Sequence, residues 1–82
     1  MNVSKDIREF FLTKKLMSST DTLEDSESLL EKGVIDSVII QEVIAFVEKK
    51  YGIVVDDDDM IPENFDSFSA IENYVNDKQN AV

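Results

Sequence analysis

Residues 33–52 read GVIDSVIIQEVIAFVEKKYG, and this stretch decides the fold. Its apolar residues recur at helical spacing, which predicts a helix from about Ser37 to Lys50. Asp36 is a favourable N-cap residue in front of that helix, and Gly52 follows the last turn, where glycine commonly ends a helix. We expect its inward face to consist of Ile40, Val43, Ile44, Val47 and Tyr51.

The same segment carries apolar residues outside that inward face, namely Val38, Ile39, Ala45 and Phe46. A helix that is apolar on more than one face is either central to the core or presents an adhesive surface, and in a small domain we expect both. Position 37 places one hydroxyl at the start of this helix, directly after an acid. This arrangement suits a serine that carries a phosphate-linked group better than a serine that acts as a nucleophile.

A first amphipathic helix is predicted over residues 3 to about 16, followed by a long loop. The expected inward residues of that helix are Val3, Ile7, Phe10 and Phe11, with Met17 as a further candidate. Residues 18–28 are rich in Ser, Thr, Asp and Glu and predict the loop. We expect Leu29, Leu30, Val34 and Ile35 to attach the end of this loop to the core.

The C-terminal half predicts two further helical pieces. Residues 53–55 form a short β-branched run that we expect to be an extended loop, because no partner strand is evident. Pro62 can begin a short helical turn that places Phe65 in the core. Asp66 or Ser67 then caps a last helix, whose expected buried residues are Phe68, Ile71, Tyr74 and Val75.

These elements predict an all-α fold, a four-helix bundle of three longer helices and one short helix with a long first loop. The chain of 82 residues is expected to form a single domain over 1–82. Within it we expect an ordered core at about 3–76 and a polar C-terminal tail at 77–82 that frays.

The composition excludes several kinds of chemistry. The chain contains no Cys, so disulfides, thiolate metal sites and thiol nucleophiles are impossible. It contains no His, which removes the usual general base near neutral pH and the commonest metal ligand. We therefore expect a protein that is not an enzyme, with no catalytic residue and no metal site.

The charge is strongly asymmetric and bears on the choice of partner. The formal net charge is −10, which is the sum of +2 over residues 1–20 and −12 over residues 21–82. Such a surface repels nucleic acid and anionic lipid and favours basic protein partners. No segment resembles a signal peptide or a membrane span. We expect a cytoplasmic monomer.

The run Asp56-Asp57-Asp58-Asp59 raises the question of a calcium loop. An EF-hand needs Gly at its sixth position and Glu at its twelfth. Counted from Asp56, those positions hold Ile61 and Ser67, so the motif fails. We interpret the run as a solvated stretch of charge and leave loose binding of divalent cations open.

Four short motifs together resemble those of acyl carrier proteins. They are Asp36-Ser37-Val38, Tyr51-Gly52-Ile53, Pro62-Glu63-Asn64-Phe65-Asp66 and Ala70-Ile71-Glu72-Asn73-Tyr74-Val75. The three-residue string alone would be weak, but an Asp-Ser pair opening the second of four helices in an acidic chain of this size is more specific. The resemblance covers about residues 3–76.

The resemblance implies a carrier modified on Ser37. A phosphopantetheinyl transferase would move 4′-phosphopantetheine from coenzyme A onto this hydroxyl, and Asp36 would help to present Ser37 to that enzyme with its metal ion. The arm ends in a thiol, which would let a chain without Cys hold an acyl or aminoacyl group as a thioester. The further partners implied are a loading ligase and downstream synthase or transferase enzymes.

The partner surface implied by the resemblance lies on the second helix. Glu42 and Glu48 match acidic positions through which such carriers meet basic patches, and we prefer a partner surface for Val38, Ile39 and Ala45. Ile40, Val43 and Val47 are core residues by preference, although they could also line a cleft for an acyl chain.

Two departures from the family patterns indicate a specialised stand-alone carrier. Fatty-acid carriers usually have Leu after the modified serine and an acid two residues after it, where this chain has Val38 and Ile39. Peptidyl carriers usually have His before the serine, where this chain has Asp36. Fatty-acid, polyketide-like and cell-envelope pathways all stay open. The alternative is an unmodified acidic helical adaptor that binds a protein through the second-helix face.

Overall fold

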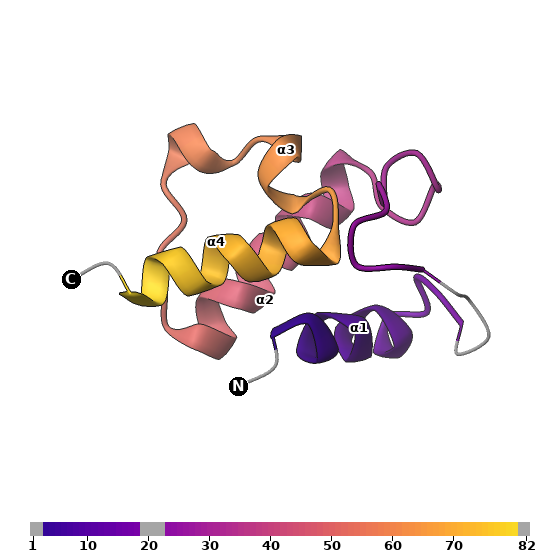
Figure 1. Cartoon of the computed structure of the whole chain (residues 1–82), viewed down its shortest axis with the longest axis horizontal. Coiled ribbons are helices and arrows are strands. Elements are labelled where there is room, and N and C mark those ends of the chain that lie inside the picture. Colours follow the sequence, from indigo (N-terminus) through magenta and orange to yellow (C-terminus); the bar gives the residue numbers. More distant parts are fainter. Residues whose placement is uncertain (1–2, 19–22, 81–82) are drawn as a thin grey trace.

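Four α-helices and one 3₁₀ turn make up the computed structural model, which describes residues 3–18 and 23–80 (Figure 1). The elements in chain order are α1 (Val3–Thr13), α2 (Ser37–Tyr51), η1 (Asp57–Asp59), α3 (Pro62–Phe65) and α4 (Phe68–Asn80). The described residues form no strand. The predicted all-α bundle of three longer helices and one short helix is therefore confirmed.

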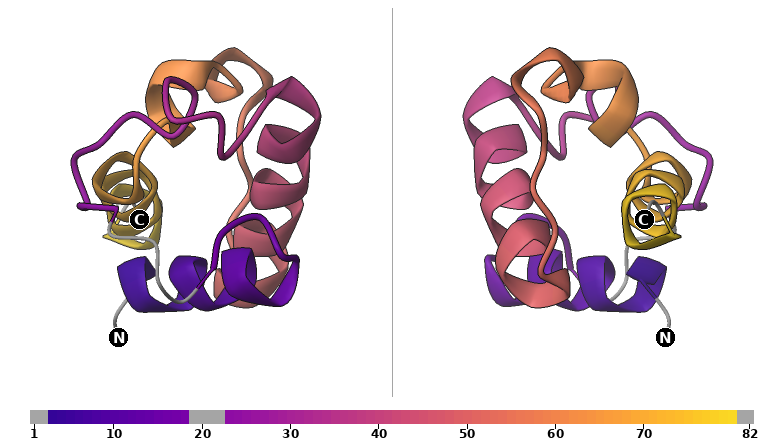
Figure 2. Two further views of the ribbon diagram at one scale, coloured as in Figure 1. Left: turned by 90° about the vertical axis from the view of Figure 1, so that its right-hand side faces the viewer. Right: turned by 90° about the vertical axis from the view of Figure 1, so that its left-hand side faces the viewer.

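The helices enclose one apolar core. Figure 2 shows α2 and α4 on opposite sides, α1 below them, and α3 above, at the end where α2 begins. α1 packs against α4, and α3 packs against both α2 and α4. The buried apolar residues are Val3, Ile7, Phe11, Leu29, Ile35, Ile40, Val43, Ile44, Val47, Ile53, Val55, Phe65, Phe68, Ile71 and Val75.

The inward face of α2 agrees with the pattern of the sequence, apart from its last member. Tyr51 is only half-buried, and its hydroxyl donates a hydrogen bond of 2.8 Å to Oδ2 of Asp6. Gly52 ends α2 as expected, with φ +66° and its N–H donating to the carbonyl of Glu48 at 3.0 Å. The positive φ explains the glycine, because a side chain at this position would be strained.

α1 ends at Thr13, earlier than the predicted boundary near residue 16. The N–H of Leu16 donates to the carbonyl of Phe11 at 2.9 Å, and the N–H of Lys15 donates to Leu12 at 3.1 Å. These two bonds, with φ +60° at Lys15, form a Schellman motif. The chain therefore reverses direction before the apolar pattern of the sequence ends.

The connection between α1 and α2 is held by Leu29, which is buried, with its N–H donating to the carbonyl of Asp66 at 2.6 Å. Leu30 was expected to anchor the loop as well, and this prediction is wrong, since Leu30 is 37% exposed. Ile35 is buried as expected, and Leu23 and Val34 also pack against the core from this connection.

α4 continues to Asn80, so the predicted fraying tail from Asp77 is helical up to that residue, and 81–82 lie outside the described residues. Nζ of Lys78 lies 2.8 Å from Oδ2 of Asp56 and holds the last turns of α4 against the segment around η1. Ser67 is the residue that caps this helix, because its Oγ accepts a hydrogen bond of 3.0 Å from the N–H of Ala70. Residues 53–55 form neither helix nor strand, which agrees with the predicted loop.

Candidate functional site

Asp36 fixes the start of α2. Its backbone is extended, with φ −137° and ψ −174°, and its Oδ1 accepts hydrogen bonds from the N–H groups of Val38 at 3.0 Å and Ile39 at 2.9 Å. Its carbonyl accepts the first helical bond, from the N–H of Ile40 at 2.9 Å. The N-cap that was predicted from the sequence is therefore confirmed, and it gives α2 a rigid first turn.

Ser37 is the first residue of α2 and is exposed. Within the described part of the chain, neither its hydroxyl nor its N–H has a hydrogen-bond partner. Two other N–H groups at this helix end, those of Val38 and Ile39, already donate to the carboxylate of Asp36. An anion at this end would therefore meet the N–H of Ser37 and the positive end of the helix dipole, with one acid beside it.

Three of the five predicted partner-surface residues share one exposed stripe of α2. Val38, Glu42 and Ala45 are all exposed, and because they are four and three residues apart they lie on one helix face. Val38 has 69% of its surface exposed, a large fraction for an apolar side chain. The stripe starts one residue after Ser37, so a protein that docks on it also meets the hydroxyl.

The other two predicted partner-surface residues lie outside this stripe. Ile39 is half-buried and packs against the core. Glu48 is also half-buried, and its Oε2 accepts a hydrogen bond of 2.9 Å from the N–H of Val55, which holds the loop after α2. Glu48 therefore has a structural role in addition to the binding role that the resemblance implies.

Sequence reasoning missed two groups of exposed residues near α2. Met60 and Ile61, each 41% exposed, lie just before α3, which packs against α2. Between α1 and α2, Phe10 and Phe46 stack at 4.4 Å in an open groove. The sequence held one indication of this groove. Ile39 and Phe46 are seven residues apart, so they share a helix face and form a second apolar stripe along α2.

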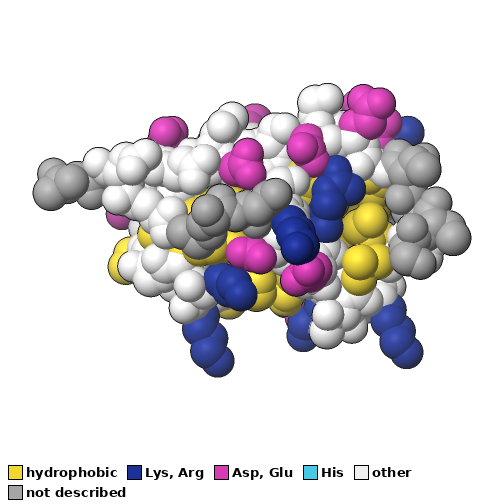
Figure 3. All heavy atoms as spheres, turned by 60° about the horizontal axis from the view of Figure 1, so that its bottom comes forward, with side chains coloured by type: hydrophobic (Ala, Val, Ile, Leu, Met, Phe, Trp, Pro, Cys, Tyr) yellow, Lys and Arg dark blue, Asp and Glu magenta, His cyan; other side chains and the backbone are white. Residues whose placement is uncertain are grey.

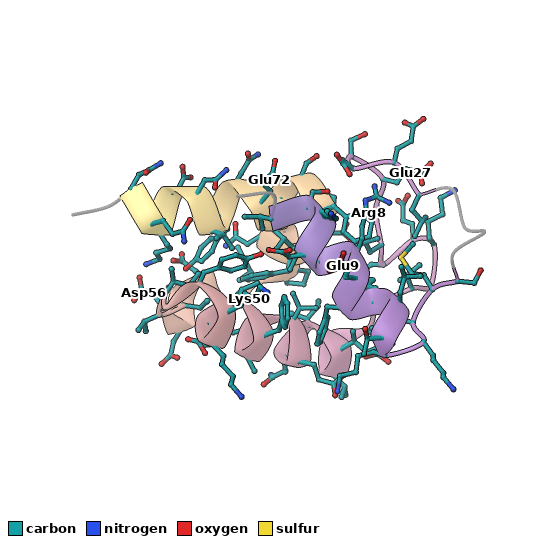
Figure 4. All side chains as sticks on the ribbon, turned by 90° about the horizontal axis from the view of Figure 1, so that it is seen from below. Arg8, Glu9, Glu27, Lys50, Asp56 and Glu72 are labelled. Carbon is teal, nitrogen blue, oxygen red and sulfur yellow. The ribbon has the colours of Figure 1, made fainter. Side chains whose placement is uncertain are left out.

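The clear pKa shifts belong to contacts that hold the fold. The guanidinium of Arg8 lies 2.6 Å from Oδ1 of Asp25, and this hydrogen bond, with a second from Ser4, lowers the pKa of Asp25. Burial raises the pKa of Tyr51, and its hydrogen bond to a carboxylate adds to the effect. Figure 4 shows Arg8 on the side of α1 that faces the segment containing Glu27, far from the C-terminal end of α4.

No protein-family model matches this chain, and a search of curated proteins finds no significant match. The resemblance to carriers therefore rests on the residues themselves. No helix among residues 3–18 and 23–80 is long and apolar enough to cross a membrane. Across the same residues, no group of three or more Asp or Glu side chains is placed to hold a metal ion.

Proposed function

We propose that this protein is an acyl carrier, which bears 4′-phosphopantetheine on Ser37 and moves an acyl or aminoacyl thioester between enzymes. The observation that best supports the proposal is the exposed, unbonded hydroxyl of Ser37 at the first position of a firmly capped helix. A hydroxyl in this position can enter the active site of another protein without local unfolding.

Ser37 is better suited to accept a group than to catalyse a reaction. The chain has no His, and the carboxylate of the preceding residue, Asp36, already accepts two backbone hydrogen bonds. No general base is therefore available beside the hydroxyl. In the proposed transfer, Oγ of Ser37 forms the new bond to phosphorus, displaces the nucleotide part of coenzyme A and gives up its proton to the transferase.

The N-terminal end of α2 fits a phosphodiester in two respects. The positive end of the helix dipole stabilises a nearby anion by about 0.3–1 kcal/mol, and the N–H of Ser37 is free to donate. The negative charge of Asp36 weakens this stabilisation of the phosphodiester. The same charge suits the second role proposed for Asp36, which is to contact a metal ion held by the transferase. The arm supplies the thiol that a chain without Cys lacks.

The exposed stripe Val38, Glu42 and Ala45 is the proposed docking surface for the transferase, the loading ligase and the downstream synthase. Apolar contacts at Val38 and Ala45 would give affinity, and Glu42 would pair with a basic group. The net charge of −10 favours partners with basic surfaces and speeds their approach.

The experiment is incubation of the purified chain with coenzyme A and a broad-specificity phosphopantetheinyl transferase, followed by mass spectrometry of the intact protein. We expect a mass gain of one phosphopantetheine group in the wild type and none in Ser37→Ala. Ser26→Ala is the matched control, because Ser26 is also exposed and should leave the modification unchanged. An unmodified wild type beside a modified control carrier would refute the proposal, and modification of Ser37→Ala would refute the site.

The alternative is an unmodified adaptor, and the 69% exposure of Val38 favours it as a second candidate. An adaptor would use the same stripe without an arm. Mass spectrometry of the chain isolated from its natural source separates the two. A modified Ser37 supports the carrier, whereas a fully unmodified chain that still binds a protein through Val38 supports the adaptor.

A further inference from the structure

A second candidate site lies between α1 and α2 and shares Glu42 and Ala45 with the exposed stripe that begins at Val38. It is an open groove of about 270 Å³ that joins a neighbouring hollow of about 420 Å³. The lining residues are Phe10, Lys14, Glu42, Ala45, Phe46, Lys49 and Lys50. Lys49 follows Ser37 by twelve residues on one helix, which separates them by about 18 Å along the axis.

The floor of the groove is apolar and open to solvent. The rings of Phe10 and Phe46 stack with centroids 4.4 Å apart and planes inclined by 28°. Both rings are only half-buried although they are large, and Ala45 beside them is exposed. The groove therefore exposes aromatic surface that the core does not cover, which is a common property of binding sites for apolar side chains.

The rim of the groove is basic. Lys14 lies over the ring of Phe10, with Nζ 5.8 Å from its centroid, and Lys49 and Lys50 line the α2 side. Figure 3 shows basic side chains beside hydrophobic surface on this underside of the molecule, and Figure 4 shows Lys50 on the side of α2 that faces α1. Glu42 is the one acid in the lining.

These lysines are not neutralised within the described part of the chain. Arg8 and Lys78 form ion pairs with Asp25 and Asp56, whereas Lys14, Lys49 and Lys50 have no acidic group within 4.0 Å. Lys15 and Lys32 also have no acidic group within 4.0 Å among the described residues, but only Lys14, Lys49 and Lys50 surround an apolar floor. They indicate a ligand that is both apolar and anionic.

We propose that this groove binds an acidic amphipathic helical segment of a partner protein. Leucine-type side chains spaced by three and four residues would cover Phe10 and Phe46, and carboxylates beside them would pair with the lysine rim. An extended polyanion, such as an anionic membrane or a nucleic acid, would also meet the acidic remainder of the chain. A single short segment touches only the groove, and this favours the peptide. The site is independent of any modification of Ser37.

The probe is a synthetic peptide of about 14 residues with Leu at helical i, i+3, i+4 and i+7 positions and Glu elsewhere. It is titrated into the full-length isotope-labelled chain, and backbone amide shifts are followed by NMR. We expect the largest shifts at Phe10, Ala45 and Phe46. Binding at all is informative, because overall charge repulsion between two acidic molecules opposes it. A peptide with Ala in place of Leu is the control for the apolar contacts and should not bind.

Substitutions of lysine by glutamate test whether the basic rim contributes to binding of the peptide. We expect Lys49→Glu to weaken the Kd by about five- to tenfold, since it removes one ion pair and adds a like charge. Lys32→Glu is the matched control, because Lys32 is exposed and outside the groove lining, and its Kd should stay within about twofold of the wild type. Ala45→Glu changes an exposed position on the floor and should abolish binding without unfolding the chain. The Ser37→Ala variant should bind the peptide with the wild-type Kd, so this experiment is independent of the test for phosphopantetheine attachment.

Several outcomes would overturn the proposal. They are no binding of the peptide, amide shifts confined to the residues around Ser37, or equal weakening by Lys49→Glu and Lys32→Glu. Self-association in sedimentation that Lys49→Glu removes would assign the groove to a second copy instead. Binding to anionic vesicles with no binding to the peptide would assign it to a lipid surface.

Discussion

Ser28 and Asp66 are 38 residues apart in the sequence, yet the hydroxyl of Ser28 donates a hydrogen bond of 2.7 Å to Oδ2 of Asp66. Oδ1 of the same carboxylate accepts from the N–H of Leu30 at 2.9 Å, and its carbonyl accepts from the N–H of Leu29 at 2.6 Å. One residue between α3 and α4 thus holds the end of the long connection, just before the chain enters α2. The position of the Ser37 end of α2 depends in part on this contact.

We predict that Asp66→Ala destabilises the protein by about 1–2 kcal/mol, because a part-buried hydroxyl and a backbone N–H lose their acceptor. The change is measured by urea unfolding, in which we expect a lower midpoint concentration and an unchanged dependence of the unfolding free energy on urea. Asp58→Ala is the matched control, since Asp58 is exposed and makes no side-chain hydrogen bond within the described part of the chain. Equal midpoints for the two variants would contradict the role of Asp66.

The two tyrosines of the chain should resist ionisation in the folded state. Burial raises the pKa of Tyr51 and Tyr74 above the ordinary value of 10.0, and hydrogen bonds to Asp6 and Asp59 add to the shift. Because the folded pKa is raised, the stabilisation is complete below pH 10 and is lost as pH rises above it. Ultraviolet absorbance of the phenolate should show less ionisation at pH 10 in buffer than in concentrated urea, with Tyr51 contributing almost none.

In concentrated urea both tyrosines should instead be half-ionised near pH 10. In the variant Tyr51→Phe, Tyr74 is the only remaining phenol, so the titration measured by absorbance belongs to Tyr74. Half-ionisation of the folded wild type near pH 10 would show that these hydrogen bonds are not formed in solution.

Lys15→Gly should stabilise the protein by about 1 kcal/mol, because Lys15 has φ +60°, a conformation that costs a side chain about that much. Thermal unfolding measures the gain. Lys15→Ala is the control, since it removes the same charge but keeps Cβ and the strain. If glycine and alanine give equal melting temperatures, the change comes from charge and not from the backbone conformation.

The core and the start of α2 were predictable because their causes are local. The spacing of Ile40, Val43 and Val47 indicates the inward face, and an acid before the helix indicates its cap. The early end of α1 was not predictable from the apolar pattern. It follows from a Schellman motif at a lysine, a residue that rarely occupies the left-handed position.

Contacts between distant residues account for the other differences. α4 extends to Asn80, and its last turns are held by the ion pair of Lys78 with Asp56, 22 residues away. Leu30 is held through its backbone N–H by Asp66, while its side chain is 37% exposed. Phe10 fits a core residue by pattern and Phe46 lies outside the inward face of α2, and only the structure shows that the two rings stack in an open groove. Sequence periodicity indicates which face is apolar, but not whether another element covers it.

Two substitutions of Asp36 separate its role as a helix cap from any role of its negative charge. Asn caps a helix about as well as Asp, so Asp36→Asn should keep the free energy of unfolding within about 0.5 kcal/mol, whereas Asp36→Ala should lower it by about 1 kcal/mol. If the carboxylate also serves the transferase, as proposed, Asp36→Asn should slow modification of Ser37 by about 10- to 100-fold, the range for groups that support a bound metal ion. Asp58→Asn is the matched control for the loss of one acid. Modification of Asp36→Asn at the wild-type rate would leave Asp36 with the cap as its only role.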